Sequence, residues 1–355
     1  MFEDFNNLFK RVFSNEETIF FALLLLVVIS LVFFIGNVLT PFIISIIFAY
    51  LLVGLQVRFE NFGMPDWLSL TITYGLFILI FGLLFLWLVP LLVQQIQTLV
   101  VELPNWFTSL RQYIAAIPTI YPDLVTSDQI RSILQNLSNQ LSQISQDFLS
   151  YSIAGIQNTV SITINLIMLP ILVFFLLFDR KSVINSFLAL LPKDRPMLSN
   201  IWDEMDDQLS NYVRGKTIEI IIVGVVAAII FSIFGLPYTA LLSVMVGFSV
   251  LIPFLGAIIA TIPVMIVGFF EFGISFEFWM LFLSYTILQM LDGNVLVPVL
   301  FSDAVKLHPF FIILAVFVFG GIFGFWGVFF AIPMATFIKA VWNAWPSSTL
   351  SLIHI

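Results

Sequence analysis

The sequence predicts an all-α polytopic membrane protein with about eight transmembrane helices, some of them broken, and one external helical insertion. Three observations predict this class. Of the 355 residues, 61% are hydrophobic and only 10% are charged, and the mean hydropathy is +1.10. Apolar runs that can cross about 30 Å of hydrocarbon recur along most of the chain rather than forming one anchor. A single sizeable polar stretch, residues 94–151, interrupts them.

The composition excludes several classes of function. The net charge of −8 disfavours nucleic acid as a partner, because nucleic-acid binding calls for a basic patch. The absence of cysteine excludes disulfides and thiolate metal sites. The two histidines, His308 and His354, are too few and too far apart for a zinc site, so no metal or cofactor is expected. A cleavable signal peptide is not expected either, since no small-residue cleavage site follows the apolar run that begins near Thr18.

The first part of the chain, residues 1–93, is predicted to hold three spans. After an interfacial lead-in, the first span covers residues 19–35 and the second covers residues 41–53. Gly36 and Asn37 lie between these spans and are expected to turn the chain, because both residue types favour turns.

The third span covers residues 67–93 and leads into the external insertion, residues 94–151. Pro90 lies near the end of this span, and we expect it to kink or loosen the helix. Within the insertion, Thr126 and Gln129 are expected to form a capping box that opens a helix with apolar residues every three or four positions. This apolar seam is expected to pack on another helix, which belongs either to the same insertion or to a second subunit.

The fourth span, residues 152–178, is followed by a cytoplasmic amphipathic connection, residues 179–216. Six of the 13 basic residues flank this connection, and the positive-inside rule therefore places it in the cytoplasm. With eight spans, both termini are also cytoplasmic and the insertion is external. Residues 198–212 present one apolar face and one acidic face. We interpret the acidic face as solvated rather than as a cation site, because adjacent carboxylates on a helix diverge in direction.

The C-terminal part of the chain, residues 217–345, is predicted to be the transport core. Its first span carries Glu219. Residues 238–270 contain a break between Pro253 and Gly256. They form either one broken helix that crosses the bilayer once or two half-helices.

The strongest candidate for a transport residue is Asp292, which lies in an apolar context where Gly293, Pro298 and Pro309 break the helix. Irregular backbone at membrane depth survives only where protein buries it or where it lines a wet cavity. An intramembrane carboxylate can exchange a proton or bind a cation as its surroundings change. The alternative interpretation of Asp292 is an acid at a helix end near the membrane surface.

Further polar side chains accompany Asp292 in the sequence, namely Gln289, Asn294, Lys306 and His308. They can form hydrogen bonds with a small polar solute, or alternatively they satisfy backbone groups that the nearby prolines leave free. Asp303 and Lys306 can also pair with each other. Similarly, Glu219 can form an ion pair with Lys216, which lies about one turn before it.

Four glycines at positions 320, 321, 324 and 327 superficially suggest a phosphate-binding loop. They lie in an apolar helix that lacks the Lys and Ser or Thr of a nucleotide loop, so we interpret them as sites of close helix packing. The chain therefore encodes no ATP site. The last span covers residues 310–344 and contains Pro333, and residues 346–355 form a tail.

Five short motifs follow one another along the chain: FFLLFDR (174–180), LLPKDR (190–195), YVRGK (212–216), IPFLG (252–256) and DGNVLVP (292–298), the last followed by LHP (307–309). In this order they resemble the autoinducer-2 exporter family, also known as PerM-type permeases, over nearly the whole chain. Arg214 and Gly215 belong to the cytoplasmic motif, and Lys216 departs from the Gln that relatives usually carry. The resemblance implies a bacterial inner-membrane transporter of eight spans that assembles as a homo-oligomer.

The resemblance and the polar groups near Asp292 together predict a secondary-active transporter. It would export a small polar signalling molecule such as autoinducer-2 by ion-coupled alternating access. A sodium/proton antiporter, in which Asp292 and Glu219 bind ion or proton in turn, is the alternative, and a passive channel also remains open. An enzyme is not expected, because no Ser-His pair, HExxH motif or aspartate dyad appears. The expected partners are the solute, protons or sodium, the lipid bilayer and further copies of the chain.

Overall fold

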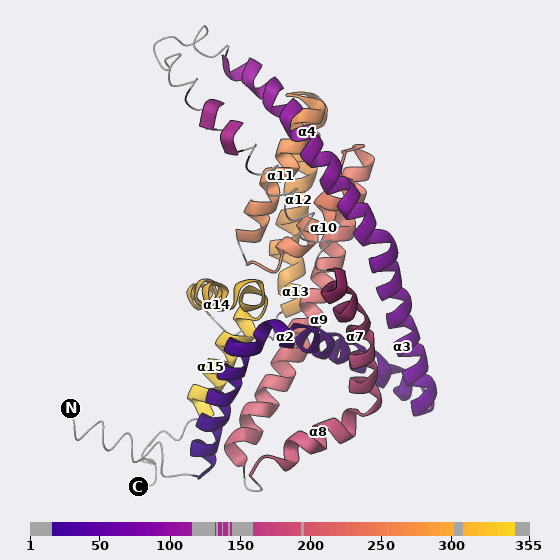
Figure 1. Ribbon diagram of the computed structural model, residues 1–355, viewed down its shortest axis with the longest axis vertical. Helices are drawn as coiled ribbons and strands as arrows, with labels where there is room; N and C mark the ends of the chain where they lie inside the picture. Colours follow the sequence, from indigo (N-terminus) through magenta and orange to yellow (C-terminus); the bar gives the residue numbers. More distant parts are fainter. Residues whose placement is uncertain are drawn as a thin grey trace, which may run out of the picture.

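The computed structural model describes residues 16–115, 159–192, 195–253, 255–301 and 308–344, together with short runs between 132 and 143. Within these residues all regular structure is helical (Figure 1), which confirms the predicted all-α fold. The elements are α2 (Glu16–Asn61), α3 (Asp66–Leu83), η1 (Leu84–Leu88), α4 (Val89–Ala115), α7 (Thr159–Phe178), α8 (Arg180–Ala189), α9 (Pro196–Ile233), α10 (Thr239–Ser249), α11 (Leu255–Phe272), α12 (Phe276–Leu291), η2 (Asp292–Leu296), α13 (Val297–Phe301), α14 (Pro309–Phe329) and α15 (Ala331–Ala344).

Six helical runs among the described residues are long and apolar enough to cross a membrane, which confirms a polytopic membrane protein. They are Val38–Asn61, Asp66–Arg111, Pro196–Ile233, Leu255–Phe272, Phe276–Phe301 and Pro309–Phe329. Three shorter apolar helices accompany them, at Ile19–Leu31, Leu166–Phe178 and Thr239–Ser249. The eight predicted spans do not correspond one to one with these helices.

The first two predicted spans lie in a single helix, α2. This helix has a kink at Ile35, where φ is −126° and ψ is 18°, and its two halves run in different directions in Figure 1. The chain thus changes direction at Ile35, one residue before the predicted turn at Gly36 and Asn37, and these two residues begin the second half of the helix. A further turn follows at Gly63, whose φ of +86° suits glycine.

The elements α3, η1 and α4 form one helical run that continues through the predicted boundary at residue 94. η1 is a π-helical segment that ends two residues before Pro90. Proline cannot donate to the carbonyl four residues earlier and its ring crowds that carbonyl, and a wider π turn relieves the crowding. The predicted loosening at Pro90 is therefore confirmed. The arrangement recurs at η2, which ends two residues before Pro298.

Helix α9 contacts α2, α10, α12, α13 and α15 and is the central element of the fold. It runs without a break from the predicted cytoplasmic connection into the predicted fifth span. Its N-terminal half packs on α2 and α15 around Phe21, Met197 and Ile201. Glu17 of α2 accepts a hydrogen bond from the backbone N–H of Leu198 at 2.8 Å. This bond satisfies one of the free N–H groups in the first turn of α9.

Helices α10 and α11 form a hairpin, here called the α10–α11 hairpin, beside the C-terminal half of α9. α10 has 11 residues, which is about 16 Å of helix and too short to cross a bilayer. Gly224 of α9 and Gly247 of α10 allow a close approach, since a Cβ on Gly247 would lie 3.1 Å from the Cα atom of Gly224. Residues 238–270 therefore form two helices rather than one broken span, which decides between the two predicted alternatives.

Helix α4 holds the end of the hairpin that is farthest from its break. The side-chain oxygen of Gln95 accepts a hydrogen bond from the backbone N–H of Leu241, in the first turn of α10, at 2.8 Å. The rings of Trp106 and Phe270 stack at 4.9 Å with an angle of 7° between their planes. The hairpin is thus attached to α4 as well as to α9.

The last predicted span, residues 310–344, consists of two helices. α14 folds back on itself at Gly324, whose φ is +58°. A Cβ on Gly327 would collide with the Phe319 carbonyl, and one on Gly320 would lie 2.8 Å from a methyl group of Val328. These two glycines therefore permit close helix packing, as the sequence predicts.

Most of the predicted helix in the insertion lies outside the described residues, including Thr126 and Gln129. Leu134 of its apolar seam is described, and this residue is buried. Whether the seam packs within one chain or between two remains a prediction.

Candidate transport site

The candidate site begins on one face of α9, where Tyr212, Lys216 and Glu219 follow one another at helical spacing. All three side chains are buried, and α9, on which they lie, is one of the candidate membrane-spanning helices. Burying an ammonium or a carboxylate alone is costly, so each needs a partner. Lys216 Nζ lies 2.7 Å from Glu219 Oε2. The sequence predicted this ion pair as the alternative to a direct role of Glu219 in transport.

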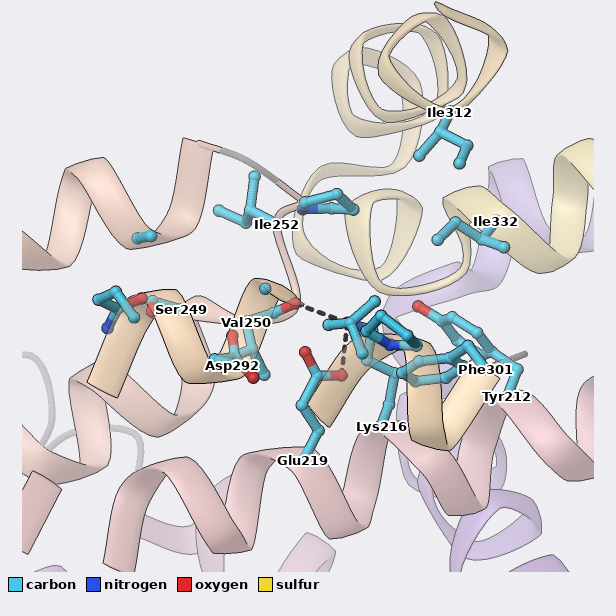
Figure 2. Close-up of a pocket in the computed structure, with 16 residues that line it drawn as sticks. Tyr212, Lys216, Glu219, Ser249, Val250, Ile252, Asp292, Phe301, Ile312 and Ile332 are labelled. Carbon is cyan, nitrogen blue, oxygen red and sulfur yellow. Dashed lines mark hydrogen bonds and ion pairs between the residues drawn. The ribbon is translucent and has the colours of Figure 1, made fainter. Parts of the chain in front are cut away.

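Lys216 also donates a hydrogen bond to the backbone carbonyl of Val250 at 2.9 Å (Figure 2). Val250 follows the last residue of α10, where carbonyls lack a donor within the helix. The next two N–H groups turn back to the carbonyls before Val250, which leaves its carbonyl to the ammonium. The helix dipole favours a cation at this end. Nζ also lies 5.1 Å from the centre of the Phe301 ring, which is within the range of a cation–π interaction.

Tyr212 makes a similar contact one turn earlier on α9. Its hydroxyl donates a hydrogen bond to the carbonyl of Phe329, the last residue of α14, at 2.8 Å. The Tyr212 ring also packs against the rings of Phe301 and Phe329. One face of α9 thus holds the ends of both α10 and α14.

Asp292 lies in η2, the π turn that precedes Pro298, and interacts electrostatically with both Lys216 and Glu219. We call these three residues the charge cluster. In the described part of the structure, Oδ1 of Asp292 and Nε2 of Gln289 are buried without a hydrogen-bond partner. With one cation and two carboxylates, the fully ionised cluster carries a charge of −1. It can therefore accept a proton or a cation.

The charge cluster lies in a cavity of about 460 Å³, a volume typical of small-molecule sites. The cavity lies where the break of the α10–α11 hairpin, α9, the π turn of α12–α13 and the α14–α15 region meet (Figure 2). Its wall is mostly apolar and is formed by Tyr212, Lys216, Glu219, Ser249, Val250, Ile252, Pro253, Ala257, Gln289, Asp292, Gly293, Val297, Pro298, Phe301, Ile312 and Ile332.

The structure brings together six of the residues that the sequence singled out, since they line the cavity: Glu219, Pro253, Gln289, Asp292, Gly293 and Pro298. Asn294 is exposed and donates its side-chain N–H to the carbonyl of Met290 at 2.9 Å. His308 is exposed and accepts a hydrogen bond from the N–H of Phe310 at the start of α14, directly before Pro309. Both side chains thus satisfy nearby backbone. Asp303 and Lys306 lie outside the described residues.

Gly256 and the Arg214–Gly215 motif have packing roles beside the cavity. A Cβ on Gly256 would collide with the carbonyl of Ser249, so this glycine lets the two arms of the hairpin meet. A Cβ on Gly215 would lie 2.7 Å from the Phe301 ring. Arg214 is exposed, and its guanidinium lies so close to Gly54 of α2 that a Cβ there would be 2.6 Å away.

Sequence reasoning missed Tyr212, Ser249 and Phe301 as parts of the site. The sequence does contain a signal for Tyr212: it lies four residues before Lys216 on an amphipathic helix, so the two side chains share one face. Ser249 and Phe301 carry no such signal, since their place in the cavity depends on how α10 and α13 pack on α9. No group of three or more His, Cys, Asp or Glu side chains suited to a metal occurs within the described residues.

An all-helical membrane protein whose broken helices enclose a charged cavity has the architecture of a membrane transport protein. The chain belongs to the AI-2E family of transporters, whose family model matches residues 19–347. It is 40% identical over 343 residues to "Putative permease PerM" of Escherichia coli strain K12, covering 97% of each chain. It is also 28% identical over 309 residues to "Putative transport protein YrrI" of Bacillus subtilis strain 168, covering 86% of each. "Putative transport protein YueF" of the same organism is 27% identical over 341 residues, with 91% of this chain and 90% of YueF covered.

Proposed function

We propose that this protein is a secondary-active transporter that exports a small polar signalling molecule such as autoinducer-2 by ion-coupled alternating access. The observation that carries the proposal is the charge cluster in its cavity. Ionisable groups within membrane-spanning helices are costly, and they mark substrate and ion pathways by default.

The unpaired polar atoms of the cavity support a hydroxylated solute. Oδ1 of Asp292 is an acceptor and Nε2 of Gln289 is a donor, and both are buried without a partner among the described residues. A buried polar atom left unpaired costs free energy that a ligand can recover. A solute hydroxyl can donate to the carboxylate while a second oxygen accepts from the amide. The apolar wall would exclude water from the remaining surface of the solute.

The broken helices support alternating access. The end of α10 lines the cavity at Val250, whose carbonyl is bound by Lys216, and Tyr212, which also lines the cavity, binds the end of α14 at Phe329. Contacts of this kind are worth about 1 kcal/mol for a neutral pair and up to about 3 kcal/mol when one group is charged. Changes in solute or charge within the cavity are therefore large enough to break them.

We further propose that the protein lies in the bacterial cytoplasmic membrane with both termini in the cytoplasm. The basic residues around α8 and the start of α9 support this orientation through the positive-inside rule. Assembly into a homo-oligomer belongs to the same proposal and rests on the family resemblance.

The proposal is tested in proteoliposomes of the purified protein with an internal pH-sensitive dye. Autoinducer-2 and sodium are added in turn across an imposed gradient. A proton flux that follows autoinducer-2 and ignores sodium supports the exporter. Liposomes with the Asp292→Asn variant, matched for protein content, should show no such flux. The absence of any flux with the native protein for either solute would overturn the proposal.

A sodium/proton antiporter is the second candidate, because Glu219 and Asp292 place two carboxylates in the same cavity. In that case the proton flux follows sodium and is unaffected by autoinducer-2. The same liposomes therefore distinguish between the two functions.

A further inference from the structure

We propose that the ammonium of Lys216 occupies the position of a bound monovalent cation in the cavity, so that protons rather than sodium ions drive this transporter. The inference rests on the proposed function in one respect, namely that transport is coupled to an ion. The occupancy of the cation position by Lys216 is a property of the site and can be tested without any transport assay.

The contacts of Lys216 are those of a small cation. Nζ has a carboxylate oxygen of Glu219 at 2.7 Å, the Val250 carbonyl at 2.9 Å and the face of Phe301 at 5.1 Å. A carboxylate and a free carbonyl at a helix C-terminus are the ligands that broken-helix transporters use for sodium. Lys216 is only 6% exposed, and its ammonium takes the carboxylate and the carbonyl that a sodium ion at this position would need.

The remaining charge of the cluster favours a proton. On the elements around the cavity, the described titratable groups that line it are Tyr212, Lys216 and Glu219 on α9 and Asp292 on η2. α10, α11, α13, α14 and α15 contribute no charged side chain to the lining described here.

Lys216 neutralises one of the two carboxylates, which leaves a single negative charge centred on Asp292. A proton needs only one oxygen atom, and Oδ1 of Asp292 is buried and unpaired. A sodium ion, like other hard cations, needs several oxygen ligands. Two of the oxygen ligands in the cavity, the Glu219 carboxylate and the Val250 carbonyl, are already bound to Lys216. The cluster can therefore become neutral by binding a proton at Asp292, whereas a sodium ion between Glu219 and Val250 would require Lys216 to leave that position.

The test compares sodium binding by native protein and three variants in detergent at pH 8.5, where protons compete least. Thermal unfolding is recorded in sodium chloride and in choline chloride at equal ionic strength. We expect no sodium-specific shift for the native protein or for Lys216→Arg, which keeps a cation in place. Lys216→Met opens the position, and its midpoint should rise by about 3 °C in 100 mM sodium. Adding Glu219→Gln to Lys216→Met removes the carboxylate and should abolish that rise.

A sodium-specific rise in the native protein would overturn the inference, whatever the variants do. A folded Lys216→Met variant without a sodium response would overturn it as well. If Lys216→Met does not fold, titration calorimetry of sodium into the native protein decides, because detectable binding contradicts the inference.

Transport measurements then separate this inference from the proposed function. Native liposomes should move autoinducer-2 with a pH gradient in the complete absence of sodium. If solute moves only when sodium is present, the exporter stands and the choice of coupling ion is wrong. If no solute moves under any gradient, the proposed function fails, while the sodium-binding results on Lys216 still decide which cation occupies the site.

Discussion

Tyr212 and Lys216 lie one turn apart on the same face of α9, and each binds the backbone carbonyl at the end of a different helix. Tyr212 holds Phe329 at the end of α14, and Lys216 holds Val250 at the end of α10. Val250 lines the cavity, and so do Ile312 of α14 and Ile332 of α15, which pack with Tyr212. Because a single rigid helix carries both contacts, the two walls of the cavity are fixed relative to each other while the contacts last.

The contact between Tyr212 and Phe329 should control access to the cavity from the side of α14. Tyr212→Phe keeps the ring and removes one hydrogen bond, which costs about 1 kcal/mol and raises the population of the separated state about five-fold. The chain has no cysteine, so a single Ile312→Cys substitution reports on this wall. We expect maleimide to label it about five times faster when Tyr212→Phe is added.

Tyr74→Phe is the matched control for this measurement. The Tyr74 hydroxyl bonds to the carbonyl of Pro170 at 3.3 Å, between α3 and α7 and away from the cavity. It should lower stability by a similar or smaller amount without changing the labelling of Ile312→Cys. Equal acceleration by both variants would show that general loosening, and not the contact with α14, controls access.

Asp292 should be required for coupled transport but not for folding. Asp292→Asn keeps the shape of the side chain and removes its charge and its exchangeable proton, so gradient-driven transport should be lost while expression and assembly stay unchanged. Asn294→Ala provides the control, because Asn294 is exposed and bonds only to the Met290 carbonyl in the contacts described. Unchanged transport in Asp292→Asn would remove Asp292 from the mechanism.

The hairpin break should tolerate no side chain at Gly256. Gly256→Ala places a Cβ against the Ser249 carbonyl, and overpacking against backbone costs about 1–3 kcal/mol. Gly82→Ala, at an open position of α3, should be neutral or stabilise the helix by up to about 1 kcal/mol. Thermal unfolding in detergent measures both. A Gly256→Ala variant as stable as Gly82→Ala would contradict the tight hairpin.

The predicted topology makes residues 118–127 external. A single Thr119→Cys substitution should react with a membrane-impermeant maleimide in intact cells. Ser186→Cys, on an exposed position of α8, should react only after the cells are lysed. The reverse pattern would invert the orientation of every span.

The sequence was sufficient to predict the all-helical class, and three of the predicted transport residues, Glu219, Gln289 and Asp292, line the cavity of the candidate site. An ionisable residue such as Asp292 or Glu219 is costly within an apolar helix, so its position is conspicuous in the sequence. The local hydrogen bonds of Asn294 and His308 were also among the predicted alternatives, because they depend only on neighbouring residues.

The remaining features depend on contacts between distant segments. Nothing in the sequence indicates that Val250 and Phe301 converge on Lys216, since this follows from the packing of α10 and α13 on α9. Helix ends were also hard to predict where a polar segment is followed by an apolar one while the helical spacing of the side chains continues. α9 therefore continues past Lys216, the last residue of the predicted connection, although its two halves differ in polarity.

The continuous helical run Asp66–Arg111 has 46 residues, which corresponds to a rod of about 69 Å. Even at a steep tilt of about 40°, such a rod rises about 53 Å, which exceeds the roughly 40–45 Å of a bilayer with its head groups. Even with the bend between α3 and α4, we therefore expect part of this run to extend beyond the bilayer. Gln95 and Trp106, which hold the hairpin, lie on its later half. The α10–α11 hairpin, whose break lines the cavity, is thus attached to a helical run that is longer than the bilayer is thick.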